Sequence, residues 1–354
     1  MTSRQEQRDG PERALRLIQV GLGGWGRDWY RRRLKDQPGV QVVGFVDASR
    51  EALAAARTEF GLDPDRCYTD LGAALGAEDA EAVLVTASLP GHVPAAGTAL
   101  AAGRHVLMEK PFAPSVAEAR SLVAAAAEAN RILMISQNYR FFPAPVEAVR
   151  IVTSGELGRL GVIHIDFRKG SVAYDKRRER HYSLPHPLLA DMAIHHFDLM
   201  RMVADSDARR VRCHSFNPPW SHFRDDAAAE AVVEMENDVV VTYRGSWVSQ
   251  APATPWSGEW RLELERGEVR FTSRDDETGE ADRLWVRKTG GRERQVKLRR
   301  MAAVDRTGSL TEFMHTVQNG SLPSTSGAAN IGSIGLTYAA IDAAASGDWV
   351  EVER

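Results

Sequence analysis

Short apolar runs alternate with helical stretches through the first 138 residues. The apolar runs have the composition of strands buried on both faces: LRLIQVG (15–21), VQVVGFVD (40–47), EAVLVTAS (81–88), RHVLME (104–109) and RILMISQN (131–138). Helices are predicted between them at 25–36, 49–60, 92–102 and 115–130. Strands and helices that alternate at these lengths form right-handed crossovers. We therefore expect an α/β Rossmann domain built on a doubly wound parallel sheet.

From residue 139 the pattern changes to strict alternation. In VIHIDFRK (162–169), apolar side chains fall on one face and polar side chains on the other. Similar runs recur at 211–216, 231–237, 239–247, 260–265, 268–272 and 283–288. Helices are predicted at 143–155, 188–204, 308–320 and 328–346. Short connections between the alternating runs predict an α+β domain with a large, mostly antiparallel sheet.

These patterns divide the 354 residues into two predicted domains. A disordered tail is expected at 1–13, the NAD(P)-binding Rossmann domain at 14–138, and an α+β domain for substrate binding and oligomerisation at 139–354. The net charge of −3 gives no electrostatic footprint for nucleic acid. The two cysteines predict neither a disulfide framework nor a thiolate metal site. No secretory signal or membrane-spanning run is seen, so a cytoplasmic location is expected.

A glycine-rich turn, GLGGWG (21–26), follows the first predicted strand and opens a helix. It matches G-x-G-x-x-G in the context that dinucleotide binding requires. Gly21 permits the tight turn, Gly23 lets the backbone approach the pyrophosphate, and Gly26 lets helix and strand pack closely. The helix N-terminus then directs N–H groups and a partial positive charge at the phosphates.

Asp47 ends the second predicted strand, 21 residues beyond Gly26. A carboxylate at this place accepts hydrogen bonds from both ribose hydroxyls of NAD. The same carboxylate repels a 2′-phosphate, so the sequence favours NAD over NADP. Arg27 and Arg50 lie where a guanidinium would offset that repulsion, and NADP therefore stays an alternative.

Two further elements carry candidate catalytic groups. Glu109-Lys110-Pro111 follows the fourth predicted strand, at the carboxyl edge where ligands bind in such sheets, and its Lys–Pro bond is a candidate for the cis form. In the predicted helix 188–204, Asp191, His195 and Asp198 fall within roughly 60° of one another at about 100° per residue.

The neighbouring histidine, His196, lies about 100° away from His195 and so points elsewhere. A carboxylate one turn from a histidine orients the ring and favours its protonated form. Asp191 is therefore expected to orient His195. An Asp/His/Asp cluster also suits a metal ion, but no further ligand is placed by spacing, and we expect no metal.

With these residues the chain resembles the glucose–fructose oxidoreductase / inositol dehydrogenase / MocA family over residues 15–350. The resemblance rests on GLGGWG (21–26), Asp47, His92 ahead of ALAAGRHV (99–106), Glu109-Lys110-Pro111, Asn138-Tyr139-Arg140-Phe141 and Asp191-x-Ala-x-His195-x-x-Asp198. It implies that Lys110, Asp191 and His195 surround the substrate carbon that exchanges hydride with the nicotinamide. The cofactor-binding residues then comprise Gly21, Gly23, Gly24, Trp25, Gly26, Asp47, Arg50, His92, Glu109, Lys110 and Asn138.

The resemblance also implies a substrate class: a secondary hydroxyl or carbonyl of a sugar, cyclitol or related polyol. One alternative is a glycoside hydrolase that oxidises its substrate transiently with NAD, without net redox change. Another is a non-catalytic NAD(P)-binding regulator, against which the retained Lys110, Asp191 and His195 weigh. The segment 167–188, dense in Arg and His, contacts an anionic substrate group or else forms a solvated loop or an oligomer contact.

Oxidation of an alcohol requires a base within reach of its proton. We assign His195 as the base, Asp191 as its orienting partner, and Lys110 as the cation that stabilises the developing alkoxide. The roles of Lys110 and His195 are interchangeable at this level. A homodimer or homotetramer is expected, formed through the more polar face of the second sheet, as in relatives.

Overall fold

The computed structural model describes residues 13–170, 175–176 and 179–354. It contains two compact units, neither of them continuous in sequence. One comprises the chain up to Glu109 with Leu122–Met134 and Glu312–Pro323; the other comprises Lys110–Ser121, Ile135–Thr311 and Ser324–Arg354. Residues 1–12 of the expected tail lie outside the described residues, as do 171–174 and 177–178 of the Arg- and His-rich segment.

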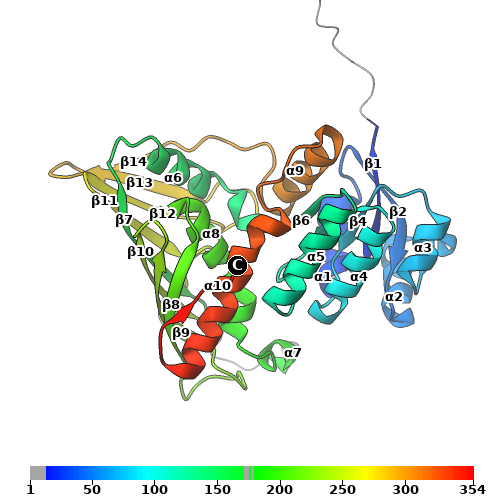
Figure 1. Ribbon diagram of the computed structural model, residues 1–354, viewed down its shortest axis with the longest axis horizontal. Coiled ribbons are helices and arrows are strands. Elements are labelled where there is room, and N and C mark those ends of the chain that lie inside the picture. Colours follow the sequence, from blue (N-terminus) through cyan, green and yellow to red (C-terminus); the bar gives the residue numbers. More distant parts are fainter. Residues whose placement is uncertain (1–12, 171–174, 177–178) are drawn as a thin grey trace, which may run out of the picture. The chain divides into compact units, whose positions relative to one another are not determined.

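The first unit is built on a six-stranded parallel sheet of order β3-β2-β1-β4-β5-β6 (Figure 1). Its strands are β1 (Leu15–Val20), β2 (Val40–Val46), β3 (Cys67–Tyr68), β4 (Ala82–Val85), β5 (His105–Met108) and β6 (Leu133–Ile135). The order reverses beside β1, which is the doubly wound arrangement that the sequence predicts. Only β3 was not predicted, because two residues are too few to show a hydrophobic pattern.

Helices follow the strands of this sheet; those within 24–34, 50–60, 89–101 and 116–128 lie at predicted places, whereas those at 64–66 and 71–77 were not predicted. They are α1 (Gly24–Trp29), which continues as the π-helical turn η1 (Tyr30–Leu34), α2 (Arg50–Phe60), η2 (Pro64–Arg66), α3 (Leu71–Ala77), α4 (Leu89–Ala101) and α5 (Val116–Glu128). At the start of α2, Ser49 Oγ accepts a hydrogen bond from the backbone N–H of Ala52. The predicted Rossmann domain is thus confirmed.

The second unit contains a nine-stranded sheet of order β14-β13-β12-β11-β7-β10-β9-β8-β15. Its strands are β7 (Leu160–Arg168), β8 (Ala208–Phe216), β9 (Ala228–Met235), β10 (Val240–Ser246), β11 (Glu259–Leu264), β12 (Gly267–Thr272), β13 (Arg283–Lys288), β14 (Arg294–Gln295) and β15 (Val350–Glu351). Only β7 and β10 pair in parallel among the described pairs of this sheet. The expected α+β domain with a mostly antiparallel sheet is therefore confirmed.

One face of this sheet packs against helices, and the alternation of side chains follows from that. Along β7, Ile163, Ile165 and Phe167 are almost fully buried. The helical elements of the unit are η3 (Asn138–Arg140), α6 (Pro143–Thr153), α7 (Glu179–Tyr182), η5 (Pro187–Ala193), α8 (Ile194–Ala204) and α10 (Gly327–Ser346), together with the first residues of α9 (Asp305–Asn319), which belongs to the first unit from Glu312 on. Buried side chains of α6, α8 and α10 share one hydrophobic core with the strands.

The predicted helix at 188–204 has two parts. Its first half, η5, is π-helical, with each N–H bonded five residues back, and only the second half, α8, is an α-helix. This difference changes which side chains share a face. Across the residues that the structure describes, no helix has both the length and the apolar character needed to cross a membrane.

Candidate active site

The glycine-rich turn joins β1 to α1. Gly21 has a φ of +93°, and a Cβ on it would lie 2.3 Å from the backbone nitrogen of Ala87. A Cβ on Gly26 would lie 1.8 Å from the carbonyl oxygen of Gly21, so only glycine fits there. By contrast, no described atom lies within 4 Å of a Cβ built on Gly23 or Gly24. The turn thus presents open backbone at the N-terminus of α1, where a pyrophosphate binds best.

Asp47 lies beside this turn, directly after β2. Its Oδ2 accepts a hydrogen bond from the Leu22 N–H at 2.7 Å, and its Oδ1 accepts one from the Ser49 N–H at 2.8 Å. The carboxylate is therefore fixed, yet its oxygens keep lone pairs for ribose hydroxyls. Arg27 forms an ion pair with Glu59 at 3.1 Å, and its Nη1 donates to the Leu22 carbonyl at 3.2 Å.

The other predicted cofactor residues form two groups. Trp25 and Arg50 are exposed, at the starts of α1 and α2. His92, Glu109 and Asn138 are buried, and each makes a hydrogen bond inside its own unit. His92 bonds to the Ala87 carbonyl at 2.9 Å, and Glu109 accepts from Trp29 Nε1 at 2.7 Å. Asn138 donates to Asp305 Oδ1. These bonds make the three buried side chains supports for the strand ends and loops that carry the site.

Lys110 lies two residues beyond β5, and its bond to Pro111 is cis. Its Nζ donates to Oδ1 of Asp191 at 2.9 Å and to the backbone oxygen of Asp191 at 2.7 Å. An ammonium has three N–H donors, so one remains for a substrate oxygen. Burial alone would raise the pKa of Asp191, but the charge and hydrogen bond of Lys110 lower that pKa below its usual value. The two groups therefore form an ion pair.

His195 lies on α8 and is 7% exposed. Its ring stacks on Tyr139, with ring centroids 4.2 Å apart and planes at 3°. Burial, and then the charges of Lys110, Arg274 and His196, hold the pKa of His195 well below its usual value. Its Nδ1 has no hydrogen-bond partner among the described residues. The imidazole is consequently neutral at pH 7 and able to accept a proton.

The expected pairing of Asp191 with His195 is wrong. The carboxylate binds Lys110, and the described residues include no hydrogen bond between Asp191 and His195. Asp191 lies in the π-helical η5, whereas His195 lies in α8, so a rotation of 100° per residue does not run from one to the other. The ring is therefore neutral and lies near a cation, whereas the sequence predicted a carboxylate that orients it and favours its protonated form.

The other two side chains of the predicted helix have structural partners. Asp198 is buried and accepts from Arg140 through both oxygens, at 2.6 and 2.8 Å. His196 is fully buried and bonds to the Tyr243 hydroxyl at 3.2 Å and to the Trp256 carbonyl at 3.0 Å. Both residues thus hold α8 in place through these bonds.

Comparison with known protein families shows to which family the chain belongs. Residues 15–137 match the family model described as "Oxidoreductase family, NAD-binding Rossmann fold", and residues 146–270 match the "GFO/IDH/MocA C-terminal domain". The two matches together span well over half of the chain. The chain belongs to the Gfo/Idh/MocA family. It is accordingly an NAD-binding oxidoreductase by family.

Individual relatives agree with that membership. An uncharacterized protein (y4oX) of Sinorhizobium fredii is 24% identical over 96% of each chain. D-apiose dehydrogenase of Paraburkholderia graminis is 31% identical over 52% of this chain and 48% of its own. The crystal structure of an inositol dehydrogenase homolog from Azotobacter vinelandii, complexed with NADH and myo-inositol, is 19% identical with a TM-score of 0.80, covering 96% of this chain and 98% of its own. At that identity the structural match speaks for the fold alone.

Two side chains of this Gfo/Idh/MocA chain join the site without having been singled out from the sequence. His181, on α7, places its Nδ1 3.9 Å from Oδ2 of Asp191. Its position in the Arg- and His-rich segment was the available signal. Arg274 follows β12 and donates to the Tyr139 hydroxyl at 3.0 Å. No sequence pattern pointed to Arg274, because its partner is 135 residues away and neither lies on a periodic element.

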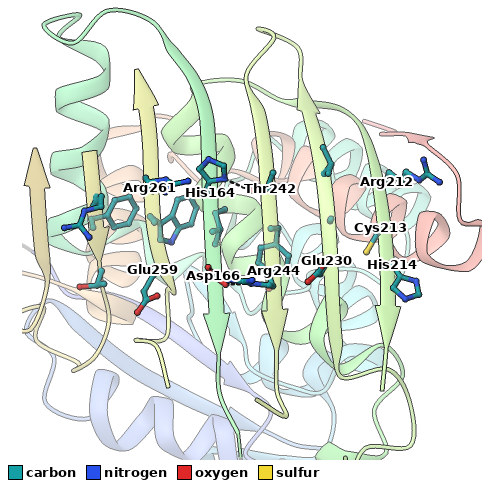
Figure 2. Close-up of a pocket in the computed structure, with 18 of the residues that line it drawn as sticks. His164, Asp166, Arg212, Cys213, His214, Glu230, Thr242, Arg244, Glu259 and Arg261 are labelled. Carbon is teal, nitrogen blue, oxygen red and sulfur yellow. Dashed lines mark hydrogen bonds and ion pairs between the residues drawn. The ribbon is translucent and has the colours of Figure 1, made fainter. Parts of the chain in front are cut away.

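A separate hollow of about 1230 Å³ lies on the polar face of the nine-stranded sheet (Figure 2). It is lined by residues of the strands, among them an Asp166–Arg244 ion pair at 2.6 Å and the His164–Thr242 hydrogen bond at 2.7 Å. Its lining contains neither Lys110 nor His195. This face is therefore distinct from the candidate active site.

Proposed function

We propose that this protein transfers hydride between NAD and a secondary hydroxyl or carbonyl of a sugar, cyclitol or related polyol. The observation that carries the proposal is the ion pair of Lys110 with Asp191 beside the neutral ring of His195. A fixed cation and an unprotonated base are the two groups that alcohol oxidation needs. Relatives named D-apiose dehydrogenase and inositol 2-dehydrogenase, 31% and 30% identical over 52% and 55% of this chain, support the substrate class.

The residues of the first unit fit the cofactor. Open backbone at Gly23 and Gly24 suits a pyrophosphate, and the fixed carboxylate of Asp47 suits a ribose diol. The same carboxylate would repel the 2′-phosphate of NADP, so we expect NAD to be preferred. NAD, when bound, supplies a hydride acceptor at its nicotinamide ring.

Side chains of the second unit are assigned to the removal of the substrate's hydroxyl proton. Lys110 uses two of its N–H donors on Asp191 and offers the third to the substrate oxygen, where negative charge develops. His195 accepts the hydroxyl proton as the C–H hydrogen leaves with its electron pair. Nε2 is the accepting atom, because Nδ1 is buried. Lys110 is assigned to the substrate oxygen rather than to the proton, because two of its donors already bind Asp191.

Oxidation of a panel of polyols tests this function. Purified protein is incubated with NAD and either myo-inositol, D-apiose or other cyclitols and sugars, and NADH absorbance is followed. We expect net NADH with at least one polyol and none with His195→Ala. Release of sugar from a glycoside without net NADH would instead establish the hydrolase alternative.

We also propose that the protein forms a homodimer or homotetramer through the polar face of the nine-stranded sheet. Alternate residues there are exposed, and they include Val232 and Val240, which are 38% and 36% exposed. Exposed apolar side chains among paired charges are typical of an interface. Val232→Asp should shift the mass measured by light scattering toward the monomer, whereas Leu322→Asp should not. A monomeric wild-type protein at micromolar concentration would refute the proposal.

A further inference from the structure

Tyr139 contacts two groups of opposite character. Its ring, only 4% exposed, stacks in parallel on the His195 imidazole with centroids 4.2 Å apart. The guanidinium carbon of Arg274 lies 4.5 Å from the centroid of the same ring, and Arg274 Nη1 donates to the Tyr139 hydroxyl at 3.0 Å. An arginine over an aromatic face is attracted by the ring's negative charge density. Tyr139 thus links a cation to the candidate base.

The backbone holds Arg274 in this place under strain. Its φ is +63°, a left-handed conformation that long side chains rarely adopt. Its backbone N–H donates to the buried carboxylate of Asp282 at 2.9 Å, which also accepts from Ser273 Oγ at 2.8 Å and from the Ala144 N–H at 2.9 Å.

A second strained residue lies at the other end of the guanidinium. Asp305, whose φ is +56°, places Oδ1 3.5 Å from Arg274 Nε. Strained conformations persist where surrounding bonds over-determine them, and they cluster at functional sites. Two such residues around one guanidinium indicate that its position matters.

We propose that Arg274 is a positioning residue for His195. Arg274 acts through the Tyr139 ring to orient the imidazole and to keep it unprotonated. The proposal rests on the proposed function, because it gives His195 the role of base. It also explains how the ring is held without a carboxylate partner. The flat stack fixes the plane of the imidazole, and the cation behind Tyr139 disfavours a second positive charge.

The electrostatic surroundings of His195 agree with this role. Burial is the main cause that lowers the pKa of His195, and the charges of Lys110 and Arg274 and the neighbouring His196 lower it further. The nearest carboxylate on the preceding turn, Asp191, is bonded to Lys110. Burial also raises the pKa of Tyr139 far above its usual value, so the stacked ring stays neutral.

Histidine titration by NMR tests the proposal on the full-length protein without substrate. The imidazole carbons of His195 are assigned from the loss of one signal in His195→Gln and followed against pH. Arg274→Gln removes the cation, and we expect the His195 midpoint to move to higher pH. Tyr139→Phe keeps the stack but loses the hydroxyl contact, and it should move the midpoint in the same direction by less.

Two controls separate charge from structure. Arg274→Lys restores a cation and should return the midpoint toward that of the wild type. Arg150→Gln removes an exposed guanidinium on α6 that is bonded to Glu147, and it should leave the midpoint unchanged. An unchanged midpoint in folded Arg274→Gln would overturn the proposal, as would an equal rise in Arg274→Lys. If Arg274→Gln does not fold, an unchanged midpoint in Tyr139→Phe overturns it.

Because no turnover is measured, the outcome does not depend on the proposed reaction. An inactive protein whose His195 midpoint moves as expected would contradict the proposed function and leave the role of Arg274 standing. Once a substrate is known, the acid limb of kcat/KM against pH should move with the NMR midpoint in Arg274→Gln. A loss of activity at all pH values with an unmoved limb would indicate a merely structural arginine.

Discussion

Replacement of Asp198 by alanine should strongly destabilise the second unit. The side chain is 1% exposed, and it accepts four hydrogen bonds. Two come from Arg140, at 2.6 and 2.8 Å, one from Ser333 at 2.7 Å and one from Asn330 at 3.2 Å. These donors belong to η3 and α10, so one carboxylate joins α8 to two other elements.

The magnitude follows from what the substitution leaves behind. The Arg140 side chain is 14% exposed and would lose its paired carboxylate. Breaking a buried ion pair by removing one partner costs about 3–5 kcal/mol. That is a large part of the roughly 5–15 kcal/mol that stabilises a typical folded protein. For domains of this size class, we expect Tm to fall by roughly 6–20 °C.

Thermal and urea unfolding, followed by circular dichroism, measure the effect. Asp348→Ala is the matched control, because Asp348 follows α10 and its side chain is exposed to solvent.

 The double variant Arg140→Met with Asp198→Ala should lose less stability than the sum of the two single losses, because no unpaired charge is then left inside. If Asp198→Ala were as stable as Asp348→Ala, the buried ion pair would contribute nothing and the argument would be refuted.

Three further predictions follow from the site. Asp47→Ser should weaken NAD binding by about 1–3 kcal/mol and improve NADP relative to NAD; calorimetric titration measures both, and an unchanged preference would refute the role of Asp47. Lys110→Ala and His195→Ala should each lower kcat by about 10²–10⁴-fold with NAD affinity nearly intact, whereas His196→Ala should cost far less activity; a larger kcat loss in His196→Ala would contradict the assignment. Burial lowers the pKa of His196 to about 4, although the Trp256 carbonyl opposes it. The unfolded chain therefore binds more protons between pH 6.5 and 4, and about 3 kcal/mol of stability should be lost as pH falls through that window. Urea unfolding of His196→Gln should show a flatter pH dependence, and an equal slope in both proteins would refute this linkage.

The sequence predicted the two sheets well because burial imposes a strict period on strands. On β10, Val241 and Tyr243 are buried while Arg244 is exposed, as the alternation requires. The glycine-rich turn could be predicted equally well, because Gly21 and Gly26 occupy places where a Cβ would collide with backbone. In both cases a local steric or solvation rule acts on neighbouring residues, and the sequence carries it directly.

The hydrogen-bond partners of the candidate catalytic side chains could not be predicted from the sequence in the same way. A stretch of apolar and polar residues does not distinguish an α-helix from a π-helix, because the two differ by one residue in hydrogen-bond spacing. The prediction that Asp191 and His195 share a helix face therefore assumed α-helical geometry where the chain is π-helical. Arg274 was missed for another reason: its contact with Tyr139 joins two irregular segments far apart in the chain, and only the folded structure brings them together.

Asp191 binds Lys110 and not His195, and this changes the expected protonation state of His195. A carboxylate bonded to His195 would favour the protonated ring and weaken it as a base at neutral pH. With the carboxylate bonded to Lys110, the single ammonium lowers the pKa of Asp191 and also contributes to lowering that of His195. The one ammonium therefore helps to keep Asp191 ionised and adds to the effect of burial in keeping His195 neutral. In the proposed reaction, the lysine assigned to the substrate oxygen thereby also favours the unprotonated form of the histidine assigned as base.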